Sequence, residues 1–209
     1  HSTILFQIRH AGVANFYGRF NEFEGTFSLN EENPVASRFD FTIKLETVDT
    51  GVSGRDDHLR SPDFFNVAQF PTATFKSTNV KKTGEDTYEV TGELNLHGQS
   101  KPITATLTKT GEGTFRGNDV MGIEAVFRIK RSDFGMTTYL APDGGEGGGI
   151  GNTVTITVAV EGVSMTIATV ERGRFELALI PTTLERTTLG ALREGDACNL
   201  EADILAKTI

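Results

Sequence analysis

Cysteine is almost absent from this chain: Cys198 is the only one among 209 residues. A lone thiol forms no internal disulfide, so cysteine usage leaves the compartment open between periplasm and cytoplasm. No apolar run approaches the roughly 20 residues that a membrane-spanning helix needs, which predicts no stable membrane insertion. The chain also lacks an initial methionine, since it begins at His1, and we expect the true N-terminus to lie upstream.

Clusters of positive charge and long helical patterns are missing as well. The basic residues are scattered and the net charge is −8, which argues against a nucleic-acid partner. Hydrophobic residues make up 37% of the chain, enough to build a core. The composition therefore favours a folded protein.

Alternation with a period of two is the dominant pattern. Phe39, Phe41, Ile43 and Leu45 share one parity within residues 37–48, and polar residues occupy the other. This places the two sets on opposite faces of a strand. The same alternation returns in residues 4–8, 88–96, 103–107, 123–129 and 154–160. Strands with one apolar face predict an all-β fold, in which an antiparallel sheet protects its edges by closing into a barrel.

The apolar face of this barrel has two interpretations. It is rich in aromatic and branched side chains, and the chain holds 15 Phe and no Trp. A barrel of about eight strands is either filled by its own side chains or holds one ligand. Periodicity does not separate a packed core from an apolar tunnel.

The stretch RDDHLRSPDFF, residues 55–65, raises the question of a metal or catalytic loop. Adjacent residues rarely converge on one ion, and an Asp–His pair here lacks a nearby nucleophile, so we expect neither a metal site nor catalytic residues. Ser61, Pro62 and Asp63 are typical of a helix start, which predicts a short helix over 62–67. Leu59, Phe64 and Phe65 would then close one end of the barrel. The charged residues would hold the loop, and Arg55 or His58 would meet a polar ligand head group.

Three further features have structural interpretations. His10 and His97 each follow strand residues and are expected to be hydrogen-bonded structural histidines. Residues 131–135, RSDFG, predict a strand-terminal turn held by an ion pair between Arg131 and Asp133. The glycine-rich segment 141–151 has no following Lys-Ser/Thr, so it is a connecting or mouth loop rather than a phosphate loop.

Five words in residues 2–161 stand in the order of a known family: HSTILFQIRHAGVANFYGRF, RDDHLRSPDFF, FPTATFKST, YEVTGELNLHGQSKPI and RSDFG. Together they resemble the YceI family of lipocalin-like polyisoprenoid-binding proteins. The resemblance implies a lipocalin-like antiparallel β-barrel with a hydrophobic pore and a non-catalytic carrier function for a polyisoprenoid, without a cofactor. The side chains expected to line the pore are Phe39, Phe41, Ile43, Leu45, Leu59, Phe64, Phe65, Phe75, Tyr88, Val90, Leu94, Ile123 and Phe127.

Residues 162–209 resemble a different family, the lumazine-binding barrel of riboflavin synthase, through the words GVSMT, LIPTTLERTTLG and NLEADILAK. Only the second half of such a barrel is present, which implies a partial domain. The resemblance assigns a half-site to Ser164, Thr166, Ile180 and Thr183. A flavin or lumazine is therefore the alternative ligand, with homodimerisation as a means of pairing two half-sites. Because catalysis in that family needs two complete sites, this segment is expected to be inactive.

Overall fold

The computed structural model describes residues 2–115, 118–163, 167–171 and 174–177. The chain separates into two compact units, residues 1–164 and 165–209. Within its described residues, the second unit has one antiparallel pair of strands, β11 (Ile167–Glu171) and β12 (Arg174–Leu177). All the other described elements belong to the first unit.

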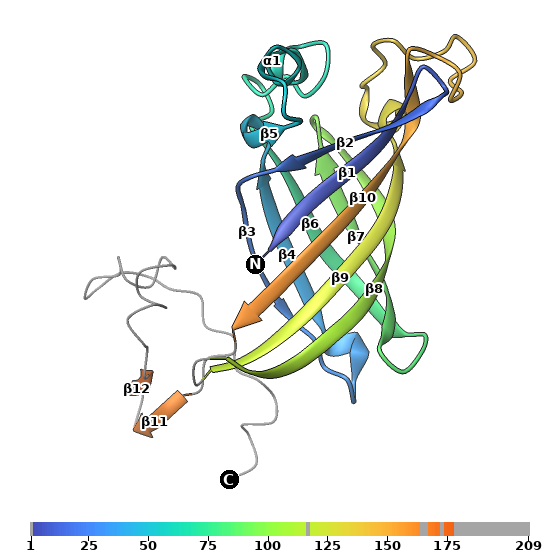
Figure 1. Ribbon diagram of the computed structural model, residues 1–209. Coiled ribbons are helices and arrows are strands. Elements are labelled where there is room, and N and C mark those ends of the chain that lie inside the picture. The colour runs from blue at the N-terminus through green and yellow to red at the C-terminus, as the bar shows by residue number, and fades with distance from the viewer. Residues whose placement is uncertain (1, 116–117, 164–166, 172–173, 178–209) are drawn as a thin grey trace. The chain divides into compact units, whose positions relative to one another are not determined.

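The first unit is a curled, 10-stranded antiparallel sheet in the order β3-β4-β6-β7-β8-β9-β10-β1-β2-β5 (Figure 1). Its strands are β1 (Thr3–His10), β2 (Ala14–Phe20), β3 (Phe23–Ser28), β4 (Arg38–Lys44), β5 (Val48–Asp49), β6 (Thr72–Lys82), β7 (Thr87–Leu96), β8 (Gln99–Phe115), β9 (Asn118–Lys130) and β10 (Ile150–Val163). The helical elements are η1 (Pro34–Ala36), η2 (Leu45–Thr47), α1 (Ser53–Arg60) and η3 (Arg131–Phe134).

Two bent segments close the sheet. β2 continues into β3 after two residues, and β4 continues into β5 through η2. β3 pairs with β4, and β2 pairs with β5 through Phe20 and Val48. Between the two pairings, the Asn21 amide donates to the Thr47 carbonyl at 3.1 Å. The predicted antiparallel barrel is confirmed, with a circumference of about eight strands, but the expected strand over 37–48 is interrupted by η2.

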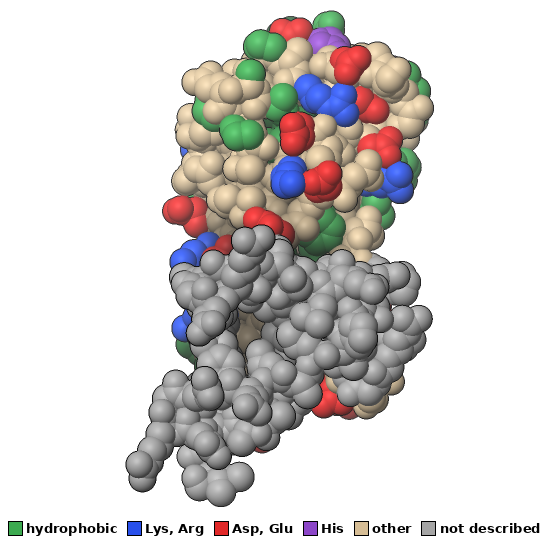
Figure 2. Space-filling view, turned by 90° about the vertical axis from the view of Figure 1, so that its left-hand side faces the viewer, with side chains coloured by type: hydrophobic (Ala, Val, Ile, Leu, Met, Phe, Trp, Pro, Cys, Tyr) green, Lys and Arg blue, Asp and Glu red, His purple; other side chains and the backbone are tan. Residues whose placement is uncertain are grey.

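The alternating residues face the interior as predicted. Phe39 and Leu45 are buried, as are Tyr88, Val90 and Leu94 on β7. Phe41 and Ile43 are partly buried on the same face of β4. The opposite parity faces outward, and Figure 2 shows acidic and basic side chains interspersed over one face of the barrel.

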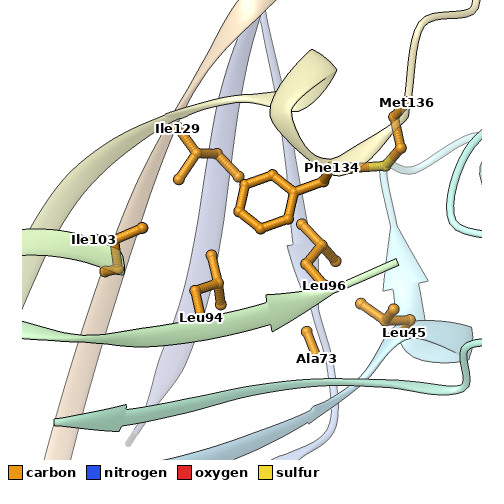
Figure 3. Close-up of a cluster of buried hydrophobic side chains, with 8 residues drawn as sticks. All are labelled: Leu45, Ala73, Leu94, Leu96, Ile103, Ile129, Phe134 and Met136. Atoms are coloured by element: carbon orange, nitrogen blue, oxygen red, sulfur yellow. The ribbon is translucent and has the colours of Figure 1, made fainter. Parts of the chain in front are cut away.

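The interior holds two clusters of buried hydrophobic side chains. The first, which we call the cavity cluster, is drawn in Figure 3 and consists of Leu45, Ala73, Leu94, Leu96, Ile103, Ile129, Phe134 and Met136. The second, the packed cluster, consists of Phe39, Val80, Tyr88, Val90, Leu107 and Ile123. Val80 and Tyr88 flank the turn between β6 and β7, so the packed cluster fills the barrel end opposite α1.

The helix expected over residues 62–67 lies elsewhere. The structure has α1 at Ser53–Arg60, and Ser61 follows its end in an extended conformation, with φ −69° and ψ 170°. Pro62 disfavours a helical conformation in the residue before it, so Ser61-Pro62 ends a helix here instead of starting one. The prediction for 62–67 was therefore wrong in position, because it read a helix stop as a start.

Charged residues of this motif hold the loop through hydrogen bonds, as expected, and two of them bind Thr50 just before it. The buried Asp56 carboxylate accepts a hydrogen bond from the Thr50 amide at 2.9 Å and another from the Thr50 hydroxyl. The Arg55 guanidinium donates to the hydroxyl and the carbonyl of Thr50, both at 2.8 Å. These bonds fix the start of α1 against the end of β5.

Glycines let three interior phenylalanine rings approach neighbouring strands closely. A Cβ atom at Gly18 would lie 2.3 Å from the Phe6 ring, and one at Gly25 would lie 2.4 Å from the Phe41 ring. At Gly92, a Cβ would lie 2.4 Å from the Phe75 ring and 2.5 Å from the carbonyl oxygen of Lys76. Each glycine thus creates the space that a ring occupies against the barrel wall.

We predict that Gly92→Ala lowers the free energy of unfolding by about 1–3 kcal/mol, because the new methyl group overlaps both the Phe75 ring and backbone. Gly113→Ala on β8 is the matched control, since a Cβ there meets nothing within 4 Å. Urea denaturation monitored by far-UV circular dichroism measures both. Equal stability of the two variants would show that the Phe75 ring does not require a glycine at position 92.

Candidate functional site

The end of the barrel next to α1 contains a cavity of about 450 Å³. Strands β1, β2, β4, β6, β7, β8, β9 and β10 all contribute to its wall, together with α1 and the segments on either side of it. Arg9, His10 and Tyr139 line the cavity and are exposed, so they mark its mouth. Figure 1 shows α1 and the loop before β10 at this same end of the barrel.

Most of the predicted pore residues line this cavity. They are Phe41, Ile43, Leu45, Leu59, Phe64, Phe65, Phe75, Leu94 and Phe127. Phe39, Tyr88, Val90 and Ile123 do not line it; they face inward but belong to the packed cluster. The alternation predicts which face a residue occupies and carries no information on its depth along the barrel axis. The packed core and the apolar cavity thus both exist, at opposite ends of one barrel.

Several lining residues were not among the predicted pore residues. Ile4, Phe6 and Ile8 on β1, and Val154, Ile156 and Val158 on β10, follow the period-two pattern and were detectable as inward-facing. Phe16 and Phe20 alternate with Gly18, so the signal there was a phenylalanine pair around a glycine. Met136 and Tyr139 lie in irregular segments, where no periodicity marks them.

Aromatic rings cover the cavity below its mouth. Phe65 contacts Phe20 edge-on with 5.6 Å between ring centroids, and Phe20 lies 5.7 Å from Phe6. Phe64 is 6% exposed and contacts the His58 ring at 5.0 Å. The residues just after α1 therefore close part of this barrel end, as the sequence predicted, although they do not lie on a helix.

Among the described residues, the lining includes Arg and His side chains but no Asp or Glu. Arg55 packs over the Phe16 ring at 4.0 Å, besides its hydrogen bonds to Thr50. His58 Nε2 lies 2.9 Å from the Asp63 carboxylate. Arg9 and His10 are exposed at the mouth, and Arg131 also belongs to the lining. The polar side chains of the lining therefore lie at and near the mouth, whereas the depth of the cavity is hydrocarbon.

Arg131 fixes the wall of the cavity near the mouth. It is 3% exposed, and its guanidinium donates to the carbonyls of Gly151 at 2.7 Å, Met136 at 2.8 Å and Ile150 at 2.9 Å. Burial lowers the pKa of Arg131 from its ordinary value, and the charge of Glu146 acts in the opposite direction. The expected ion pair with Asp133 is wrong: Arg131 binds backbone carbonyls instead, because these converge where η3 meets the start of β10.

The other predictions from the sequence concern a structural histidine, metal binding, membrane insertion and the lumazine half-site. His97 Nδ1 lies 2.9 Å from the Phe134 carbonyl, consistent with a structural histidine. Among the described residues, no group of three or more His, Cys, Asp or Glu side chains is arranged to hold a metal ion. The same residues include no helix of sufficient length and hydrophobicity to cross a bilayer. Ser164, Thr166, Ile180 and Thr183, the predicted lumazine half-site, lie outside the described residues.

Comparison with known families gives two matches. Residues 1–162 match the YceI-like domain, and residues 150–203 match the lumazine binding domain. A UPF0312 protein of Pectobacterium atrosepticum is 43% identical over 164 residues, which cover 78% of this chain and 81% of that protein. Protein YceI of Salmonella arizonae is also 43% identical, over 78% of this chain and 82% of its own length.

Solved structures share the fold. BcnA of Burkholderia cenocepacia aligns with a TM-score of 0.68 at 21% identity, covering 77% of this chain and 96% of that one. A YceI protein of Campylobacter jejuni aligns with a TM-score of 0.65 at 25% identity, over 73% and 86%. A polyisoprenoid binding domain from Saccharophagus degradans aligns with a TM-score of 0.56 at 19% identity, over 77% and 92%.

We predict different consequences for two phenylalanines near the mouth. Phe134 is 1% exposed and does not line the cavity, so Phe134→Ala should cost about 3–5 kcal/mol of folding free energy. Phe65 is partly buried and lines the cavity. Phe65→Ala should therefore cost clearly less folding free energy than Phe134→Ala, and it should weaken binding of an apolar dye. Thermal unfolding and dye titration of both variants check this. An equal loss of stability would mean that Phe65 is a core residue and not a cavity wall.

Proposed function

This chain belongs to the YceI-like domain family, and from that premise we propose that it is a non-catalytic carrier of a polyisoprenoid or a similar long apolar molecule. The observation that carries the proposal is the apolar cavity of about 450 Å³ within the barrel. Cavities of about 300–1,000 Å³ are typical of small-molecule sites. The carrier binds its ligand without a cofactor.

Hydrocarbon burial supplies the affinity. Each buried methylene group contributes about 0.8 kcal/mol, so a long tail binds tightly without polar contacts in the depth of the cavity. The solved relative from Saccharophagus degradans is described as a polyisoprenoid binding domain, which supports an isoprenoid tail here. The polar head group of the ligand remains at the mouth, where the side chains of Arg9 and His10 are exposed.

The arrangement of the mouth supports a carrier rather than an enzyme. The Arg131 guanidinium donates hydrogen bonds to three backbone carbonyls, and the Arg55 guanidinium donates to Thr50. His58 contacts Asp63 on the exposed side of the cavity. These groups hold the mouth in shape. The remaining wall is hydrocarbon, which binds an apolar ligand and excludes water but supplies no group for bond-making chemistry.

Mass spectrometry of solvent extracts from the purified protein tests the carrier function. We expect an isoprenoid or similar long-chain lipid in the extract and no flavin absorbance. Ile156→Trp, which fills the cavity from β10, should abolish the co-purified lipid. Thr157→Trp is the matched control, because Thr157 pairs with the exposed Leu5 and Val126 on the outer face. Lipid retained at wild-type level in Ile156→Trp would place the ligand outside the cavity and refute the proposal.

A second candidate function is lumazine or flavin binding, favoured by the match of residues 150–203 to the lumazine binding domain. The first part of that match is β10, which pairs with β1 on one side and β9 on the other. Its cavity-facing residues Ile156 and Val158 also line the apolar site. Because β10 serves the first barrel, it is not free to complete a lumazine barrel, and this candidate is the weaker one.

We predict that the purified chain does not convert dimethylribityllumazine to riboflavin. Catalysis by proximity needs two complete sites that face each other, whereas the matched segment supplies half of one barrel. The assay follows riboflavin fluorescence during incubation with the lumazine, with a riboflavin synthase as positive control. Steady riboflavin formation that disappears in a Ser164→Ala, Thr166→Ala double variant would contradict this prediction.

A further inference from the structure

The cavity ends inside the barrel. Every member of the cavity cluster except Phe134 lines it. Among the described residues, no member of the packed cluster does so. A ligand tail that enters at the α1 end therefore meets a boundary between the two clusters.

Three side chains form that boundary, and we call them the floor: Phe41, Phe75 and Ala125. They line the cavity and also pack against the packed cluster. Phe41 on β4 and Phe75 on β6 are direct cross-strand partners. Ala125 lies on β9, which two further strands separate from β6. The floor is thus built from two sides of the barrel.

The two rings of the floor are held in place from behind. The Phe41 ring lies against Gly25 and the Phe75 ring against Gly92, each at a distance that leaves no space for a Cβ. Phe75 also packs against both clusters. Interiors packed in this way resist displacement of a side chain, so a tail cannot push the floor aside at little cost.

The cavity volume indicates the length of tail that fits above the floor. An apolar cavity of about 150 Å³ accommodates benzene. The cavity of about 450 Å³ is therefore large enough for roughly 15–20 carbon atoms. This corresponds to about three or four isoprene units.

We propose that Phe41, Phe75 and Ala125 determine the length of hydrocarbon tail that this protein buries. The proposal rests on the carrier function and names its ligand class: amphipathic molecules with a tail of three or four isoprene units inside the barrel. A longer tail leaves its additional units at the mouth, where they add no affinity.

Competition native mass spectrometry with an equimolar series of all-trans prenols, from two to eight isoprene units, tests this inference. For the wild-type protein we expect occupancy to rise steeply up to three or four units and then to level off. Phe75→Ala removes a floor ring and should move this plateau to a longer prenol. Phe27→Ala is the matched control, because Phe27 packs against the packed cluster without lining the cavity, and its plateau should stay unchanged.

Ala125→Leu tests the floor in the opposite direction, by reducing the length of tail that fits. It also tests the floor if Phe75→Ala fails to fold. The larger side chain raises the floor and should move the plateau to a shorter prenol, whereas Val126→Leu on the outer face should not. If no prenol binds the wild-type protein, the function as an isoprenoid carrier is refuted. If prenols bind but affinity keeps rising with length, or both floor variants keep the wild-type plateau, the floor is refuted and the carrier function stands.

Discussion

Closure of the sheet is the constraint on which the other features depend. A sheet edge left open would expose unpaired backbone groups, and this chain avoids that with two bent segments, β2–β3 and β4–β5, that pair with each other twice. The bends fix the circumference, and the circumference fixes the interior volume that side chains must fill. The same bend at η2 leads directly into β5 and α1, so closure also places the residues that surround the mouth.

The interior is filled at one end and hollow at the other because of where the side chains lie. At the packed end, the Phe27 ring stacks on Phe39, Tyr88 is fully buried, and the packed cluster joins side chains of β4, β6, β7, β8 and β9. At the cavity end, the Phe6 ring occupies the space that a side chain at position 18 would fill, so Gly18 lets this ring lie close to the wall. Small residues such as Ala73 add to the space. A stable packed end thereby supports an open end that gains its missing contacts from a ligand.

The sequence alone predicted the faces of the strands well, because a period of two reports directly on side-chain direction. It did not predict depth: Phe39 and Phe41 share a face, yet only Phe41 reaches the cavity. The position of the helix was missed because Ser61-Pro62 satisfies the rule for a helix start and also the rule for a stop. Long-range hydrogen bonds, such as those of Arg131 to Gly151, have no signature in local sequence.

The two family matches overlap on β10, and the pairing of that strand decides between them. β10 pairs continuously with β9 from Thr153 to Val163 and with β1 from Val154 to Ala159. Removing it would open the barrel, expose two strand edges and destroy the wall formed by Val154, Ile156 and Val158. A strand bound on both sides cannot serve a second barrel at the same time. The lumazine-binding match therefore begins on a strand that the YceI-like barrel already uses, and its first word, GVSMT, starts on the last two residues of that strand.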